Sequence, residues 1–172
     1  MIIDENGVLV SLEEKDRNII KNTGTITLHD DIKAIGDGCF RNTDPDLKSI
    51  VIPDNVAIIG KYAFQSCTFL ESVIIHGGVK VIRKYAFYDS DGIKRLEIGS
   101  GVRIIEDCAF CSIDPVEKIF IPKSVEAIGE RGFGGNPLST IYCEAESKPL
   151  RWDADWSKYS GSVIWGCRPE TK

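Results

Sequence analysis

The chain has 172 residues and a net charge of −5 at pH 7. Hydrophobic residues make up 42% and charged residues 27%, which is the composition of a folded globular domain rather than a disordered chain. An acidic chain lacks the basic footprint of a nucleic-acid-binding protein, so no nucleic-acid partner is expected. No segment approaches the roughly 18 consecutive apolar residues of a membrane span, and none is predicted.

Residues 1–31 are expected to form an N-terminal lead-in that ends in an entering strand around Ile26 and Leu28. The opening stretch, MIIDENGVLVSLEEKD, has no basic segment ahead of an apolar run, so no signal peptide is predicted. The chain would then lie at the cell surface or outside the cell if a signal was removed from it, and in the cytoplasm otherwise. The mixed charges over residues 13–17 predict a solvated turn.

A phenylalanine recurs through residues 32–143, with an isoleucine five positions before it and a small residue directly before it. The first step between these phenylalanines is 24 residues and the next three are 23, giving Phe40, Phe64, Phe87, Phe110 and Phe133. A unit of this length cannot bury its own apolar stripe, but stacked units bury it in one continuous core. The period therefore predicts five repeats in a solenoid, with the phenylalanines pointing inward.

Each unit also contains a Leu-x-x-Ile-x-Ile pattern, whose alternation is the period of a strand. Stacked units would place these strands side by side in one parallel sheet of six on one face. A Val-x-x-Ile-Gly pattern predicts a second short extended segment, and the phenylalanine segment predicts a turn or short 3₁₀ piece. The Leu-x-x-Ile-x-Ile members are Leu47-Ile50-Ile52, Leu70-Val73-Ile75, Ile93-Leu96-Ile98, Val116-Ile119-Ile121 and Leu138-Ile141-Cys143.

These columns resemble the BspA-like leucine-rich-repeat family of bacteria, whose unit reads roughly V-x-x-I-G-x-x-A-F-x-x-C-x-x-L-x-x-I-x-I-P. The segment VAIIGKYAFQSCTFLESVIIHGG matches that unit almost throughout. The resemblance implies a β-rich leucine-rich-repeat solenoid with right-handed coils, used for protein interaction and often found at a cell surface. It implies no catalysis. The sequence departs from the unit at Arg83 and Glu106, which replace the glycine, and keeps the family cysteine only as Cys67.

Residues 144–172 are expected to cap the last repeat, because the end of a solenoid exposes an apolar face that a terminal segment must cover. Trp152 and Trp156 would supply the covering area, and their spacing of four places both rings on one face of a short helix. The alternative is a carbohydrate-binding site in which these two rings stack on a sugar beside Asp153 and Asp155.

The reactive residue types do not form a catalytic or metal-binding pattern. Cys108 and Cys111 have the C-x-x-C spacing, but no second pair follows to complete a zinc site, and the period places them beside the inward Phe110. His29 and His76 each follow a strand and are expected to be solvated. We therefore predict no enzyme activity, no metal and no cofactor.

The outward positions of the predicted strands form a row on the exposed face of the sheet. Several members of this row are apolar or aromatic, although their position should face solvent. Strand formers packing on one another across the sheet would explain the same residues. The hypothesis is a protein-interaction or adhesion module with a protein partner, and a glycan as the alternative ligand. The candidate binding residues are Val51, Ile74, Glu97, Phe120 and Tyr142, preceded in the row by Thr27.

Overall fold

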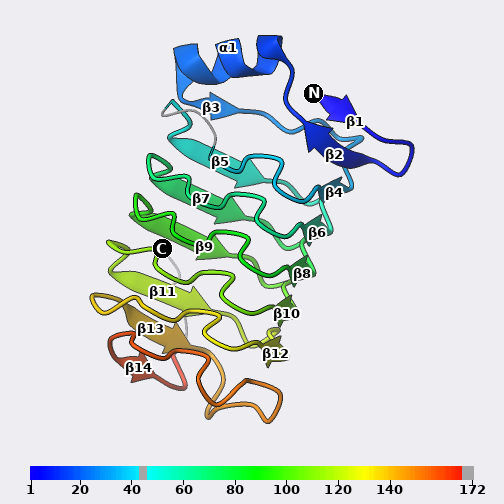
Figure 1. The fold of residues 1–172 in the computed structure, drawn as a ribbon. Helices are drawn as coiled ribbons and strands as arrows, with labels where there is room; N and C mark the ends of the chain where they lie inside the picture. Colours follow the sequence, from blue (N-terminus) through cyan, green and yellow to red (C-terminus); the bar gives the residue numbers. More distant parts are fainter. Residues whose placement is uncertain (43–45, 168–172) are drawn as a thin grey trace.

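Residues 1–42 and 46–167 are described by a computed structural model, in which the repeats stack as successive coils of one solenoid (Figure 1). Each of the five repeats contributes one two-residue strand and one longer strand of four residues, as the two extended patterns predict, and shorter or longer strands continue both rows at the ends. No helix in the described part of the chain is long and apolar enough to cross a membrane.

The longer strands lie along one side of the solenoid, each parallel to the strand of the next coil. They form a four-stranded and a three-stranded sheet, whereas the repeat predicts a single sheet. The division falls between β9 (Arg95–Ile98) and β11 (Lys118–Ile121), which lie side by side but do not join in one hydrogen-bonded ladder (Figure 1). The first sheet contains β3 (Thr25–Ile26), β5 (Ser49–Ile52), β7 (Ser72–Ile75) and β9 (Arg95–Ile98), and the second contains β11 (Lys118–Ile121), β13 (Thr140–Cys143) and β14 (Val163–Ile164).

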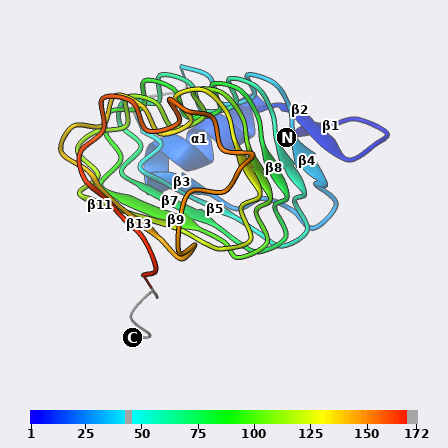
Figure 2. The same cartoon turned by 90° about the horizontal axis from the view of Figure 1, so that it is seen from below.

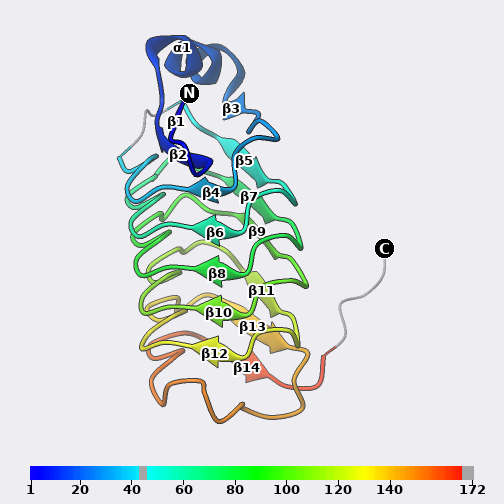
Figure 3. The same cartoon turned by 90° about the vertical axis from the view of Figure 1, so that its right-hand side faces the viewer.

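The two-residue strands form a separate seven-stranded sheet along another side of the coils (Figures 2 and 3). Its N-terminal edge is an antiparallel hairpin that turns at Gly7, whose φ of 78° favours glycine. All other pairings in this sheet are parallel. The strands, in spatial order, are β1 (Ile2–Ile3), β2 (Val8–Ser11), β4 (Ala34–Ile35), β6 (Ile58–Ile59), β8 (Val81–Ile82), β10 (Ile104–Ile105) and β12 (Ala127–Ile128).

The repeated phenylalanines form a continuous stack through the core. All five are fully buried, and successive ring centroids lie 4.8, 4.9, 5.1 and 5.1 Å apart. The backbone around each ring forms turns, and no 3₁₀ helix occurs among the described residues. The prediction that the phenylalanines point inward, one per coil, is confirmed.

A polar column beside the stack satisfies carbonyl groups that the phenylalanines bring into the core. Three residues after its own phenylalanine, a side chain reaches the phenylalanine carbonyl of the preceding coil. Ser90 Oγ donates to the Phe64 carbonyl at 2.6 Å, and Asn136 Nδ2 donates to the Phe110 carbonyl at 2.9 Å. Because an unpaired buried carbonyl is costly, Ser90 and Asn136 remove this penalty in their coils, whereas the buried Ile113 occupies the same position in the coil between them.

The N-terminal lead-in contains a helix that the sequence reading missed. The charged run predicted as a solvated turn leads into α1 (Glu14–Thr23), which lies across the N-terminal end of the solenoid (Figure 1). Its N-terminus has a capping box in which the Glu13 N–H donates to Asp16 Oδ2 at 2.9 Å. The helix ends at Gly24 in the left-handed conformation and buries Ile20 against the core.

The segment predicted as a C-terminal cap continues the solenoid by one more coil. Strand β14 pairs in parallel with β13, and Trp152 forms a parallel bridge with Ile128 of the coil above. The Phe133 N–H also donates to the Trp156 carbonyl at 2.9 Å. The segment thus covers the fifth repeat by adding a coil, whereas residues 168–172 of the expected cap lie outside the described residues.

One predicted core position is wrong. Leu138 was placed in the first column of the strand pattern, but it is 70% exposed and the buried position belongs to Ser139. Ser139 Oγ donates to the Val116 carbonyl at 2.5 Å, which satisfies the hydroxyl inside the core. The reason is a turn one residue shorter than in the preceding coils: the register is 23 residues between Val73 and Leu96 but 22 between Ile119 and Ile141.

Truncating one ring of the phenylalanine stack should strongly destabilise the protein. Phe87 is buried between Phe64 and Phe110, so Phe87→Ala leaves a cavity and should lower the free energy of unfolding by about 3–5 kcal/mol. Urea denaturation followed by circular dichroism measures the change. The matched control is Phe69→Ala, because Phe69 is half-exposed and should cost less than about 1 kcal/mol. Equal costs for the two substitutions would contradict the role assigned to the stack.

Candidate functional site

The candidate binding row begins on the four-stranded sheet, where the ladder brings its predicted members into register. Val51 of β5 is paired with Ile74 of β7, which is paired with Glu97 of β9. Val51 is 43% exposed, Ile74 is half-buried and Glu97 is exposed. Thr27, which follows β3, is also exposed. The alternation of the strands therefore turns these side chains outward while Ile50, Val73 and Leu96 fill the core.

The row continues on the three-stranded sheet. Phe120 of β11 is paired with Tyr142 of β13, and their rings stack with centroids 4.9 Å apart. Phe120 is 38% exposed and Tyr142 is half-buried. The ladder adds Ile164 of β14, paired with Tyr142 and 42% exposed. The sequence reading missed Ile164 because it assigned this segment to the cap. Ile164 nevertheless lies one coil after Tyr142, its partner in the ladder.

A charged pair divides this row into two apolar halves. The Arg95 Nε donates to Glu97 Oε1 at 2.8 Å within β9, at the junction between the two sheets. Both side chains are exposed, so the pair contributes little to stability but places a polar step in the middle of the surface. We call the outward residues Val51, Ile74, Glu97, Phe120, Tyr142 and Ile164 the longer-strand row.

The tryptophans proposed as an alternative sugar site are buried. Trp152 is 2% exposed and Trp156 is 3% exposed, and they pack on one another with ring centroids 4.9 Å apart. The Trp152 indole N–H donates to the Val125 carbonyl at 3.2 Å, so its polar atom is satisfied inside the protein. A sugar-stacking site needs an exposed ring face, and neither of these two rings offers one.

The expected helix around these tryptophans is absent, because residues 149–159 form turns and one bridge. The sequence signal for the observed arrangement is the repeat period itself, since Trp156 lies 23 residues after Phe133. Its ring meets Phe133 edge-on at 6.1 Å, at an interplanar angle of 86°. Trp156 therefore occupies the place of the phenylalanine in the added coil.

The cysteines are free thiols, and four of the six are buried. None of the six, all within the described part of the chain, forms a disulfide. Burial raises the pKa of the Cys39 and Cys143 thiols to about 12. Burial, with the neighbouring Cys111, raises the pKa of the half-buried Cys108 to about 11. Because the thiolate is the reactive form, these shifts disfavour a nucleophilic or redox role at neutral pH.

The histidines and acidic residues also remain dispersed. His76 is exposed at the end of β7, where its Nδ1 lies 3.7 Å from Asp54 Oδ2, and His29 is exposed after β3. Among the described residues, no group of three or more histidine, cysteine, aspartate or glutamate side chains is placed to hold a metal ion.

The last coil should be required to keep the fifth repeat soluble. Truncation after Glu146 removes Trp152 and Trp156 and exposes the Phe133 ring and the β13 edge. We expect aggregation or fraying of that coil, measured by light scattering and by hydrogen exchange over residues 127–143. Tyr159→Ser, which alters an exposed ring of the same coil, should leave both measurements unchanged. A monomeric truncation with native protection would contradict this role.

Cys108 should react slowly in the folded protein despite its partial exposure. Its raised pKa keeps the thiol protonated below about pH 11, so the thiolate population at pH 8 is small. Iodoacetamide labelling followed by mass spectrometry should show at least about tenfold slower modification of Cys108 in the native protein than in the unfolded one. Similar rates in both states would contradict the assigned environment.

Comparison with solved structures supports the fold described above. A leucine-rich cell surface protein from Faecalibacterium prausnitzii is 21% identical, with 96% of this chain and 52% of that chain covered and a TM-score of 0.69. The leucine-rich-repeat protein TpLRR of T. pallidum is 19% identical, with 79% and 70% covered and a TM-score of 0.60. For the pneumococcal vaccine antigen PcpA the identity is 16%, the coverages are 72% and 31%, and the TM-score is 0.58.

The match thus spans about a third of the pneumococcal antigen and about half of the F. prausnitzii protein. At these identities the likeness concerns the fold alone. A search of curated protein sequences found no match. The sequence profile of the BspA type leucine rich repeat region, however, matches six copies over residues 33–154, which is most of the chain. The repeat period, the stacked coils and this match together establish that the chain belongs to the BspA-type leucine-rich-repeat family.

Proposed function

We propose that this chain is a non-catalytic interaction or adhesion module that binds a protein partner through the longer-strand row. The observation that carries the proposal is the exposure of apolar and aromatic side chains at outward strand positions, in register from coil to coil. Its membership in a leucine-rich-repeat family supports an interaction or surface role. The similarity to the leucine-rich cell surface protein of F. prausnitzii supports the same class of function.

The geometry of the row favours a partner with a flat or gently curved apolar surface. The stacked pair of Phe120 and Tyr142 presents adjoining ring edges beside Ile164, and aromatic residues commonly dominate the energy of protein interfaces. Each side chain projects from a strand that is hydrogen-bonded to its neighbours. A partner therefore meets a surface whose backbone is already ordered, and binding loses little backbone entropy.

The Arg95–Glu97 pair would allow the row to discriminate between partners. A partner that covers both apolar halves must also cover this pair and replace the water around its charges. An apolar partner group placed there would leave the charges without solvent, which is unfavourable. Partners with polar groups opposite Glu97 are therefore favoured over uniformly apolar ones.

Replacing two members of the row should abolish partner binding without unfolding the protein. Ile74→Ser with Phe120→Ser removes one apolar side chain from each half. If each is an interface anchor worth about 2 kcal/mol and the two losses add, the Kd for a partner isolated from the source organism should rise roughly 700-fold. Surface plasmon resonance measures the Kd, and circular dichroism checks that the double variant remains folded.

The matched control is Tyr62→Ser, which removes an exposed aromatic ring from the turn side of the coils, outside the row. It should leave the Kd within about threefold of the wild-type value, because surface substitutions outside an interface have small effects. Unchanged binding by the folded double variant would place the partner on another surface. Binding that depends on a glycan rather than on a protein would contradict the proposed class of partner.

A further inference from the structure

The seven-stranded sheet carries a second outward row that the longer-strand row does not include. In each of the two-residue strands β4 to β12 the first residue faces outward and the second is buried. The outward residues are all aliphatic, half-buried and joined by the parallel ladder from coil to coil. They are Val8, Ala34, Ile58, Val81, Ile104 and Ala127, which we call the short-strand row.

A groove lies at the N-terminal end of the short-strand row, over β2, β4 and β6. Its lining combines the row with the exposed Val10 and with Gly36 and Gly60. Both glycines lie close to the backbone of the preceding coil: a Cβ would lie 2.6 Å from the Leu9 carbonyl oxygen at Gly36 and 2.7 Å from the Asp37 nitrogen at Gly60. The next two coils have Arg83 and Glu106 at the same place in the repeat. Arg83 forms part of the groove wall.

The edges of this region carry cations that are not neutralised within the protein. Lys33 and Lys80 are exposed at the position before Ala34 and Val81, and each Nζ donates to a backbone carbonyl at 2.9 Å. In the described part of the chain neither lysine forms an ion pair. The Arg83 Nε is buried and has no hydrogen-bond partner among the described residues.

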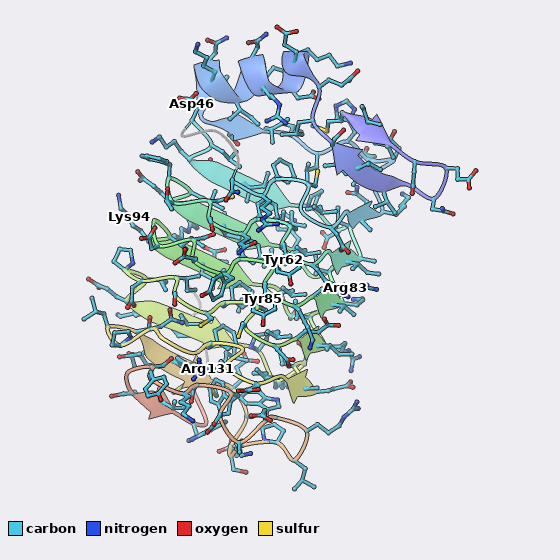
Figure 4. The ribbon with its side chains drawn as sticks, viewed as in Figure 1. Asp46, Tyr62, Arg83, Tyr85, Lys94 and Arg131 are labelled. Carbon is cyan, nitrogen blue, oxygen red and sulfur yellow. The ribbon has the colours of Figure 1, made fainter. Side chains whose placement is uncertain are left out.

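Figure 4 shows Arg83 beside β8, on the side of the coils that also carries the labelled Tyr62 and Tyr85. The two tyrosine rings stack on each other at 5.2 Å, so each uses one ring face within the protein. Arg83 contributes to the lining of the groove, whereas neither tyrosine does. The one acidic side chain in the groove lining, Asp37, accepts a hydrogen bond from the Lys61 N–H at 2.8 Å.

We propose that this groove docks a peptide segment of a partner protein that combines aliphatic side chains with carboxylates. Charge complementarity selects this occupant: the floor is aliphatic, and three cations, Arg83 in the lining and Lys33 and Lys80 beside the short-strand row, outnumber the one acidic side chain of the lining, Asp37, although the whole chain carries a net charge of −5. Aliphatic side chains would cover Ile58 and Val81, and carboxylates would reach the lysines on one edge and the guanidinium on the other. The inference does not depend on the longer-strand row, which lies on a different sheet.

The test selects peptides from a random dodecapeptide library displayed on phage, using the immobilised wild-type protein. We expect the enriched peptides to combine aspartate or glutamate with valine, isoleucine or leucine. Fluorescence anisotropy then gives the Kd of the enriched peptides for the variants. The double variant Lys33→Glu with Lys80→Glu should raise the Kd about tenfold, as expected when two exposed ion pairs become repulsive contacts. Ile58→Asp should also raise the Kd, because it places a negative charge on the aliphatic floor of the groove.

The matched control is Lys118→Glu with Lys123→Glu, which makes the same change of charge at two exposed lysines outside the groove. This control should leave the Kd within about twofold of the wild-type value, because the changed charges lie outside the groove and salt screens their interaction with a peptide bound there. A selection that yields no peptide, peptides without acidic enrichment, or equal losses in the two double variants would overturn the proposal. Concentration-dependent dimers of the wild type that Ile58→Asp disrupts would instead assign the groove to a second copy of this chain.

Discussion

The stacking of one phenylalanine ring on the next is the interaction on which the other features of this solenoid depend. The ring centroids repeat at 4.8 to 5.1 Å, close to the spacing of about 4.8 Å between hydrogen-bonded strands. The core and the backbone ladders therefore share one pitch. The rings are nearly parallel, with interplanar angles of 13° or less. A small residue directly precedes each ring, so the chain turns without crowding the stack. These residues are Cys39, Ala63, Ala86, Ala109 and Gly132.

Each end of the stack needs a covering group that the interior rings do not need, because an end ring has a neighbouring ring on one side only. At the N-terminal end, α1 lies across the coils and buries Ile20 in the core. At the other end, Trp156 meets Phe133 edge-on and packs against Trp152 and Trp165. An edge-on indole does not present a parallel face to a further ring. The tryptophans thus close the aromatic stack, which explains why residues that look suited to sugar binding are buried.

The sequence predicts the repeated part of this fold well because its columns are fixed by packing. The phenylalanine column and both strand patterns could be read from spacing alone. The helix was harder to find because its capping box uses Glu13 and Asp16 rather than the more familiar serine or threonine. Leu138 was misplaced because a pattern of spacings does not show where a turn loses one residue. For the division of the sheet between β9 and β11, we find no signal in the sequence.

The candidate surfaces were less predictable than the core because outward positions are not fixed by packing. The members of the longer-strand row could be named, but Ile164 was hidden by treating the last coil as a cap. The short-strand row had a signal that went unused: the residue six positions before each phenylalanine is aliphatic in all five repeats. Its position beside Lys33, Lys80 and Arg83 could not be inferred without the coil geometry. Spacing shows which residues share a row, but it does not show which rows adjoin.

The coil geometry also bears on how the two surfaces would work together. A parallel ladder places equivalent residues of successive coils side by side, so any residue type repeated on the outside becomes a stripe. The longer-strand row contains two aromatic rings, whereas the short-strand row contains only alanine, valine and isoleucine. It is bordered by Lys33 and Lys80, which form no ion pair with any residue that the structure describes. These rows therefore suit partners of different chemistry. Because the rows lie on different sides of the same stacked coils (Figure 3), the two proposed partners would not compete for the same surface.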